Sequence, residues 1–169
     1  MDYQEAKGKY IQAWGTLGSS WGINKAMAQI HALLLVSPKP LSTDTIMEEL
    51  SISRGNANMN IRSLIDWGIV NKEFIPGQRK EYFSSEKDIW ELARRVIKER
   101  RKRELEPVIK VLKEVSSIKS DGSEESEEFV KMTKELADFS VQTDNLLDLA
   151  MKAEQNKVLN KFIGFFAKS

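Results

Sequence analysis

Short amides, hydroxyls and guanidinium groups gather on one side of residues 54–67. With 3.6 residues per helical turn, they point away from the apolar face of the same segment. Asparagine can pair with two atoms of an adenine edge, arginine with two atoms of a guanine edge, and an apolar tip can touch a thymine methyl group. The side chains with this chemistry are Arg54, Asn56, Asn58, Met59, Asn60, Arg62 and Ser63, with Asn60 on the flank of the polar side. A solvated helix more often carries Glu and Lys, so these side chains suit contact with DNA bases. An exposed helix that is polar by chance is the alternative, and the elements on both sides of this helix favour the DNA-contacting interpretation.

Local signals define residues 54–67 as a helix. Ser53 is a good N-cap, because its hydroxyl can accept a hydrogen bond from a free amide of the first turn. Gly68 suits the left-handed position just past the end. The apolar face that would pack against the rest of the domain consists of Ala57, Ile61, Leu64 and Ile65. Ser53, at the exposed start of the helix, is included among the expected DNA contacts.

A second short helix precedes this one. Residues 41–50 are amphipathic, and Ser42 is a suitable N-cap with Thr45 and Glu48 as candidate partners. The link to Ser53 is only two residues long, as a helix-turn-helix requires.

A basic hairpin is predicted after the helix. Residues 69–75 are rich in branched and aromatic side chains, and Pro76-Gly77 suits a type II turn. Residues 81–83 can return as the partner strand. The tip carries Gln78, Arg79 and Lys80, which are expected to contact flanking DNA. Two helices followed by a basic hairpin predict a winged helix-turn-helix.

Composition limits the class of protein. The 169 residues contain no cysteine, which excludes disulfides and thiolate metal sites. The longest wholly apolar run, residues 32–36, is too short to span a membrane, and the acidic start differs from a signal peptide, so a cytoplasmic protein is expected. Residues 53–103 hold 13 Lys and Arg against 7 Asp and Glu, whereas residues 104–169 hold 9 against 13. Positive charge is therefore concentrated around the proposed DNA-contacting elements.

Two helices are predicted before the helix-turn-helix. Residues 3–17 form a modest amphipathic helix, and the Gly-rich stretch 15–20 is expected to break it as a turn. Residues 23–36 form a mostly buried helix that stops at Ser37-Pro38. His31 on that helix is the only histidine, so it is expected to be a packed or surface residue and not a metal ligand.

The last half of the chain is predicted to be helical. Residues 86–119 form a long segment with a kink or restart near Glu106, because Pro107 removes a helical hydrogen bond. The basic run 100–103 within it, preceded by Arg94, Arg95 and Lys98, is expected to be a solvated face, with contacts to flanking phosphates or to an acidic partner segment as alternatives. Residues 120–123 are a linker, and a further helix follows with a break near 140–143.

The chain ends in apolar side chains that need cover. Val158, Leu159, Phe162, Ile163, Phe165 and Phe166 crowd the last turns. Helices of a second copy are the expected cover, giving a homodimer, while folding back on the same chain is the alternative. The overall prediction is a mainly α protein with a small β-wing. An N-terminal helix and turn (1–20) precedes a winged helix-turn-helix domain (21–85) and a long helical dimerisation region (86–169).

Residues 21–110 resemble the GbsR-type regulators of the MarR-like winged helix-turn-helix superfamily. The similar features are the Ser53-Arg54-Gly55 helix start, the Trp67-Gly68 exit, the hairpin tip 76–80 and the basic segment 90–107. The resemblance implies a dimeric DNA-binding transcriptional regulator, a repressor, controlled by a small effector such as choline or a related osmoprotectant. Two positions depart from the family. Asn56 and Asn58 stand where serines are common, so the operator sequence cannot be carried over, and Ala28 stands where glycine is common.

Other functions have less support. A winged helix used only as a protein-interaction module, without DNA readout, would not need basic residues on both helix and hairpin. An enzyme has no support, because the sequence shows no nucleophile–base pair, and neither a cofactor nor a metal is expected. An aromatic cage for a quaternary ammonium could use Tyr10, Trp14, Trp21 and Trp90, but aromatics at helical spacing more often belong to the core.

Overall fold

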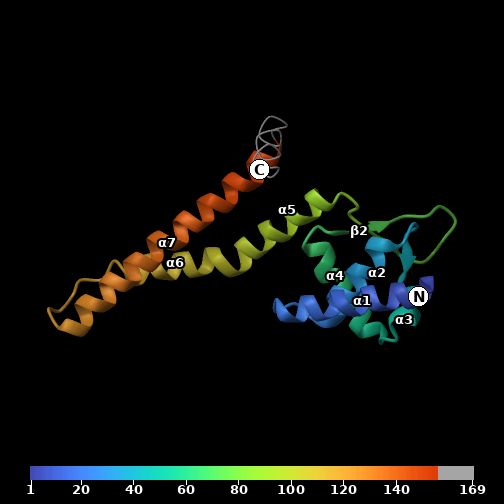
Figure 1. The fold of residues 1–169 in the computed structure, drawn as a ribbon, viewed down its shortest axis with the longest axis horizontal. Coiled ribbons are helices and arrows are strands. Elements are labelled where there is room, and N and C mark those ends of the chain that lie inside the picture. The colour runs from blue at the N-terminus through green and yellow to red at the C-terminus, as the bar shows by residue number, and fades with distance from the viewer. Residues whose placement is uncertain (156–169) are drawn as a thin grey trace. The chain divides into compact units, whose positions relative to one another are not determined.

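The computed structural model describes residues 1–155, and of residues 153–155 only the backbone. The chain is mainly helical with one small antiparallel sheet, as predicted (Figure 1). It divides into two compact units, Met1–Val96 and a second that begins at Ile97. The first unit includes the N-terminal helix and extends past residue 85, where the winged-helix domain was expected to end. The apolar tail 158–166 lies outside the described residues.

Glycines let the first two helices approach closely. Helix α1 (Tyr3–Ser20) continues through residues 15–20, so the predicted turn there is wrong. Gly15 and Gly18 are buried, and a Cβ at Gly18 would lie 2.5 Å from the Cβ of Ala28 on α2 (Lys25–Val36). The chain turns only at Gly22, which has a positive φ of 74°. The Ala28 methyl therefore occupies the space that Gly18 leaves open.

This contact predicts opposite effects at two glycines of one helix. Gly18→Ala should lower the free energy of unfolding by about 1–3 kcal/mol, because the new methyl overlaps Ala28 and overpacking outweighs the helix preference of alanine. Gly8→Ala is the matched control, since a Cβ there meets nothing within 4 Å. It should raise the free energy of unfolding by about 0.5–1 kcal/mol. Urea unfolding measures both.

A compensating change completes the test. Adding Ala28→Gly to Gly18→Ala should restore most of the lost stability, because it removes the overlapping methyl. Equal stability of Gly18→Ala and the unmodified protein would show that α1 and α2 can separate without cost.

The helix-turn-helix forms where the caps predict it. Helix α3 (Thr43–Leu50) begins at the Ser42 cap, whose hydroxyl accepts from the Thr45 amide at 3.2 Å. Helix α4 (Arg54–Asp66) begins at the Ser53 cap, whose hydroxyl accepts from the backbone amide of Asn56 at 3.3 Å. Between them Ser51 takes the left-handed conformation with φ of 52°. The faces of α2, α3 and α4 that meet in the core contribute Ile30, Leu33, Leu34, Ile46, Ala57, Ile61 and Leu64.

The sheet has three strands in the order β1-β3-β2. The hairpin strands β2 (Val70–Glu73) and β3 (Tyr82–Ser85) pair with Val70 opposite Ser85. The two-residue strand β1 (Leu41–Ser42), which the sequence did not predict, pairs with the other edge of β3. The tip turns at Pro76-Gly77, where Gly77 has φ of 79° and the Gln78 amide donates to the Ile75 carbonyl at 3.1 Å, as a type II turn requires.

A π-helical segment accommodates the internal proline. Helix α5 (Ile89–Arg100) passes into the π-helix η1 (Arg101–Leu105), and helix α6 begins at Glu106 (Glu106–Val115). Pro107 has no amide hydrogen, so the regular bonding pattern cannot cross it and the preceding turn widens. The predicted restart near Glu106 is therefore confirmed.

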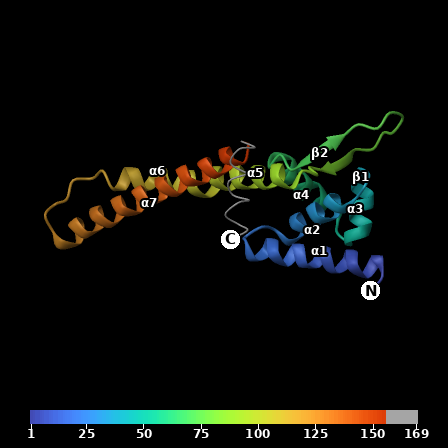
Figure 2. The same ribbon diagram turned by 45° about the horizontal axis from the view of Figure 1, so that its top comes forward.

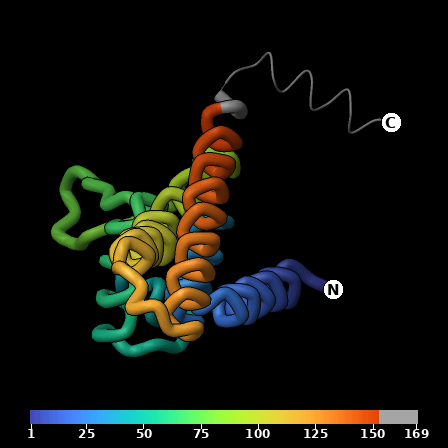
Figure 3. The backbone as a smooth tube through the Cα atoms, turned by 90° about the vertical axis from the view of Figure 1, so that its left-hand side faces the viewer, coloured from blue at the N-terminus to red at the C-terminus, as the bar shows by residue number. Residues whose placement is uncertain are grey.

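A helical hairpin forms the described part of the second unit. Helix α7 (Glu124–Gln155) packs alongside α6 and η1 (Figure 2), and residues 116–123 connect the helices at one end (Figure 3). The predicted break at 140–143 is wrong. Helix α7 runs through these residues without interruption, and the Thr143 hydroxyl donates to the Phe139 carbonyl at 2.9 Å within it. None of the described helices combines the length and the apolar character needed to cross a membrane.

Candidate nucleic-acid interface

One face of α4 is open to solvent. Its opposite face buries Ala57, Ile61 and Leu64, each 2% exposed or less. The residues exposed on the open face are Ser53, Arg54, Asn58, Met59 and Arg62, and Asn56 and Ser63 are half-buried beside them. Met59 keeps 58% of its surface in solvent. Two guanidinium groups, an amide and an apolar tip are therefore presented side by side along about two turns of helix.

Asn60 differs from the expectation. It is predicted on the flank of the polar face, but it is only 2% exposed. Its Nδ2 donates to the carbonyl of Asn56 at 2.9 Å and to Oδ1 of Asn56 at 2.5 Å. Asn60 lies three residues after Ala57 and four before Leu64, the spacing of the buried face. In this structure it orients Asn56 and does not present its own amide to solvent.

The hairpin tip is exposed throughout. Gln78, Arg79 and Lys80 all lie in solvent, and the Tyr82 hydroxyl donates to Oε1 of Gln78 at 3.4 Å. Phe74, just before the tip, is 86% exposed, and its hydrophobic surface was not singled out from the sequence. The tip thus offers two cations, and an exposed aromatic ring lies just before it in the chain.

An aspartate joins α4 to the hairpin. Oδ1 of Asp44 lies 2.5 Å from a guanidinium nitrogen of Arg54, and Oδ2 lies 2.8 Å from Nζ of Lys80. Lys80 and then Arg54 hold the pKa of Asp44 below its usual value, and Asp44 raises the pKa of Lys80. Asp44 was not singled out from the sequence, because only folding brings residues 44, 54 and 80 together.

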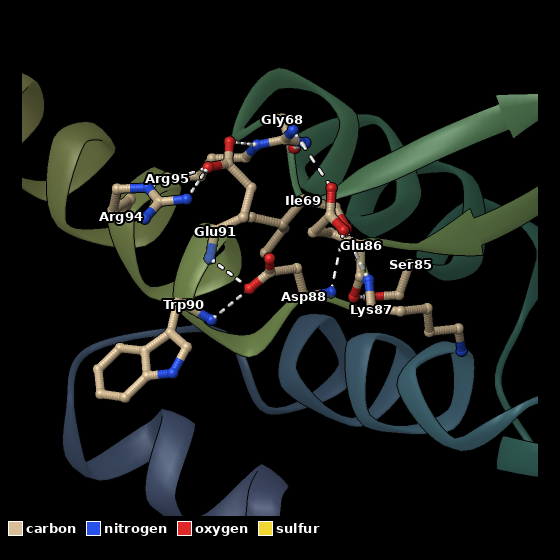
Figure 4. Close-up of polar contacts among 10 residues, drawn as sticks. All are labelled: Gly68, Ile69, Ser85, Glu86, Lys87, Asp88, Trp90, Glu91, Arg94 and Arg95. Carbon is tan, nitrogen blue, oxygen red and sulfur yellow. Dashed lines mark hydrogen bonds and ion pairs between the residues drawn. The ribbon is translucent and has the colours of Figure 1, made fainter. Parts of the chain in front are cut away.

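Arg95 fixes the far end of α4. Its guanidinium donates to the carbonyl of Gly68 at 2.5 Å, donates to Oε1 of Glu91 at 2.6 Å, and lies 3.2 Å from the Glu86 carboxylate (Figure 4). Gly68 has φ of 71°, and the Ile69 amide donates to the Leu64 carbonyl at 3.2 Å, which closes the helix end. Arg95 therefore ties the exit of α4 to the start of α5.

Other basic residues of α5 and η1 are also engaged. Arg94 donates to Glu91 at 2.6 Å, and together with Arg95 it lowers the pKa of Glu91. Arg101 makes a two-point contact with Asp144 of α7, at 2.6 and 2.9 Å. The expectation of a solvated basic face is wrong for Arg101, whose side chain is 17% exposed. Arg101 links η1 to α7.

Lys87 caps the end of α2. Its ammonium donates to the carbonyls of Leu34, Leu35 and Ser37 at 2.8, 2.6 and 2.9 Å. Carbonyls in the last turn of a helix lack the full set of backbone donors, and the Leu34 carbonyl also accepts from the Ser37 amide at 3.3 Å. The lysine supplies further donors here and joins the strand β3 exit to α2.

His31 is a packed residue. It is 6% exposed, and its ring lies 6.4 Å from that of Trp14 between centroids. Burial, and secondarily Lys87, lower its pKa to about 4, so it is neutral at pH 7. Among the residues whose side chains the structure describes, no group of three or more His, Asp or Glu could hold a metal ion.

Of the four aromatics considered for a cage, two pack on the core and two are exposed. The rings of Tyr10 and Trp14 lie 5.8 Å apart between centroids, tilted by 40° to each other, and both residues pack on the core. Trp21 and Trp90 are 59% and 67% exposed.

Comparison with known proteins shows the fold alone. No protein-family model matches the chain, and no curated protein sequence matches it. Among solved structures, one described as the crystal structure of a transcriptional regulator superposes with a TM-score of 0.68 at 18% sequence identity. The match covers 89% of this chain and 99% of that one, so the likeness includes both the winged helix and the helical hairpin.

Proposed function

We propose that this protein is a dimeric, sequence-specific DNA-binding transcriptional regulator that acts as a cytoplasmic repressor and not as an enzyme. Helix α4 enters the major groove, and the hairpin tip 76–80 contacts flanking DNA. The observation that carries the proposal is the open face of α4, where Arg54, Asn58 and Arg62 are exposed on a helix whose other side is fully packed. Because one face of the helix packs on the core and the other is exposed, the helix can enter a groove of DNA without any change in the fold.

Each side chain has a role that follows from its chemistry. Arg62, Asn58 and Met59 face base edges, and Asn56 does so in the orientation that Asn60 sets. Ser53, Ser63 and Gln78 supply polar contacts, while Arg54, Arg79 and Lys80 meet phosphates. Asn60 does not contact DNA itself in this proposal and acts only by orienting Asn56.

The hairpin lysine tests the phosphate role. Lys80→Gln should weaken binding to all duplexes alike and reduce the slope of log affinity against log salt by about one unit, because one phosphate contact is lost. Fluorescence anisotropy at several salt concentrations, on a preferred and a random duplex, measures it. Lys39, in the exposed loop after α2, supplies the control. Lys39→Gln should leave the slope unchanged, and a selective loss on the preferred duplex from Lys80→Gln would contradict the assignment.

Dimerisation through α7 accounts for its exposed apolar side chains. Two rows run along the helix with alternating steps of three and four residues, the repeat of a coiled-coil seam. The inner row, which is buried or half-buried and includes Asp144 bound to Arg101, is Val130, Thr133, Ala137, Ser140, Asp144 and Leu147. The outer row begins with Phe129, Met132, Leu136 and Phe139 and includes Leu146. These side chains are 42–68% exposed.

The hairpin has little core of its own. Ala137 is the only buried hydrophobic residue of the described part of the second unit. A second copy that covers the outer row would bury surface that the single chain leaves in water, and a two-fold dimer would place two α4 helices on a palindromic site.

Control by a small effector, with choline or a related osmoprotectant as the candidate, completes the proposal and rests on the resemblance to GbsR-type regulators. Selection experiments with and without these compounds test it. The alternative, a winged-helix interaction module without DNA readout, predicts no salt-dependent binding to any duplex.

A further inference from the structure

Asp44 touches a basic group on each of the two elements that the proposed function places on DNA. It is the second residue of α3, and its two carboxylate oxygens bind Arg54 at the start of α4 and Lys80 of the hairpin, at 2.5 and 2.8 Å. The three side chains line a hollow of about 200 Å³, whose other walls are Ser42, Thr43, Asn58 and Glu81. The carboxylate therefore lies inside the surface that would face a phosphate backbone.

Both cations keep donors for an outside anion. The side chains of Arg54 and Lys80 are each 62% exposed, while that of Asp44 is 34% exposed. Arginine carries five N–H donors and lysine three, and Asp44 engages only part of each set. A phosphate oxygen can therefore approach Arg54 and Lys80 while Asp44 stays in place, but it meets a trio whose net charge is +1 instead of +2.

We infer that Asp44 is a specificity-determining residue, which fixes the positions of Arg54 and Lys80 and reduces their attraction for phosphate. Phosphate contacts attract any sequence, whereas base contacts of α4 attract only the right one. A carboxylate among the phosphate-binding cations weakens the phosphate contacts and leaves the base contacts of α4 intact. Asp44 thus widens the gap between preferred and random DNA. This inference rests on the proposed function.

The test is Asp44→Asn, which keeps the shape and removes the charge. Affinity for a random duplex should rise about threefold to tenfold, and the salt slope should steepen by about one unit, because Arg54 and Lys80 act with their full charge. The ratio of affinities for a selected and a random duplex should fall. Asp44→Ser should give the same result, and circular dichroism and the melting temperature show that each variant is folded.

A neighbouring carboxylate separates this role from net charge. Glu48 is exposed on the same helix, so Glu48→Gln removes one negative charge away from the hollow. It should change random-duplex affinity less than twofold and leave the slope unchanged. Equal effects of Asp44→Asn and Glu48→Gln would overturn the inference, as would weaker binding of Asp44→Asn to random DNA.

A double-mutant cycle locates the effect. In a Lys80→Gln background, about half of the gain from Asp44→Asn should disappear, because one of its two cationic partners is gone. A gain that persists in full would also overturn the inference. The proposed function is judged separately, since binding of the unmodified protein to any duplex, measured in the same series, does not depend on the outcome at Asp44.

Discussion

Phe139→Glu combined with Leu146→Glu on α7 is expected to convert the protein from a dimer to a monomer. Both side chains lie in the outer row and are 68% and 66% exposed in the single chain. A buried side chain of this size contributes about 1.5–3 kcal/mol, and a two-fold interface contains each residue twice, so about 6–12 kcal/mol of association free energy is removed. The fold of each chain should be unaffected. Sedimentation velocity at micromolar concentration distinguishes the two states.

The monomer should also bind a palindromic site about 10²–10⁴-fold more weakly, because the two reading helices are no longer tied together. Asn145→Glu is the matched control. Asn145 precedes Leu146 but lies in neither row, so this variant should remain a dimer. A chain ending near Ser120, which lacks α7 altogether, should sediment as a monomer. If the double variant stays dimeric, the interface lies elsewhere on the protein.

Arg62→Ala is expected to remove discrimination at one base pair of the preferred duplex. Arg62 is exposed on the outer face of α4, one residue after the buried Ile61. A two-point contact between arginine and guanine discriminates against the wrong base by about 1–3 kcal/mol, or roughly fivefold to 150-fold in affinity. Binding to random DNA should change far less. Competition between the preferred duplex and its single-base variants measures the loss.

Asn56→Ala and Asn60→Ala extend this test. Asn56→Ala should relax a different base position by a similar amount, and Asn60→Ala should relax that same position, because Asn60 orients the Asn56 amide at 2.5 Å. The melting temperature reports any loss of stability from the cavity at Asn60. Equal effects of Arg62→Ala, Asn56→Ala and Lys80→Gln on preferred and random DNA would contradict the separate roles assigned here.

Features set by neighbouring residues could be predicted from sequence. The limits of α4 follow from Ser53 and Gly68, and the restart at Glu106 follows from Pro107, since capping and the missing amide act within one turn. The hairpin turn at Pro76-Gly77 is equally local. The open polar face of α4 follows from the helical period, except at Asn60, whose spacing from Ala57 and Leu64 outweighs its polarity.

Features set by contacts across the fold could not be predicted. In the sequence, Gly15 and Gly18 resemble turn residues. Only the fold shows that Gln29 and Ala28 lie so close to them that a Cβ would not fit. Strand β1 is two residues long and exists only because β3 lies beside it. The place of Asp44 in the proposed DNA-contacting surface could not be predicted for the same reason, because its partners lie 10 and 36 positions away in the chain.

Selection of bound duplexes from a random pool, performed with the full-length protein, is the most direct test that the open face of α4 reads DNA. The proposed function predicts enrichment of a palindromic sequence whose half-sites lie about 10 base pairs apart, with Arg62→Ala losing the preference at one position of each half-site. Repeating the selection with choline and with glycine betaine tests the effector. Recovery of a pool no different from the starting one, from a folded dimeric protein, would contradict the central claim.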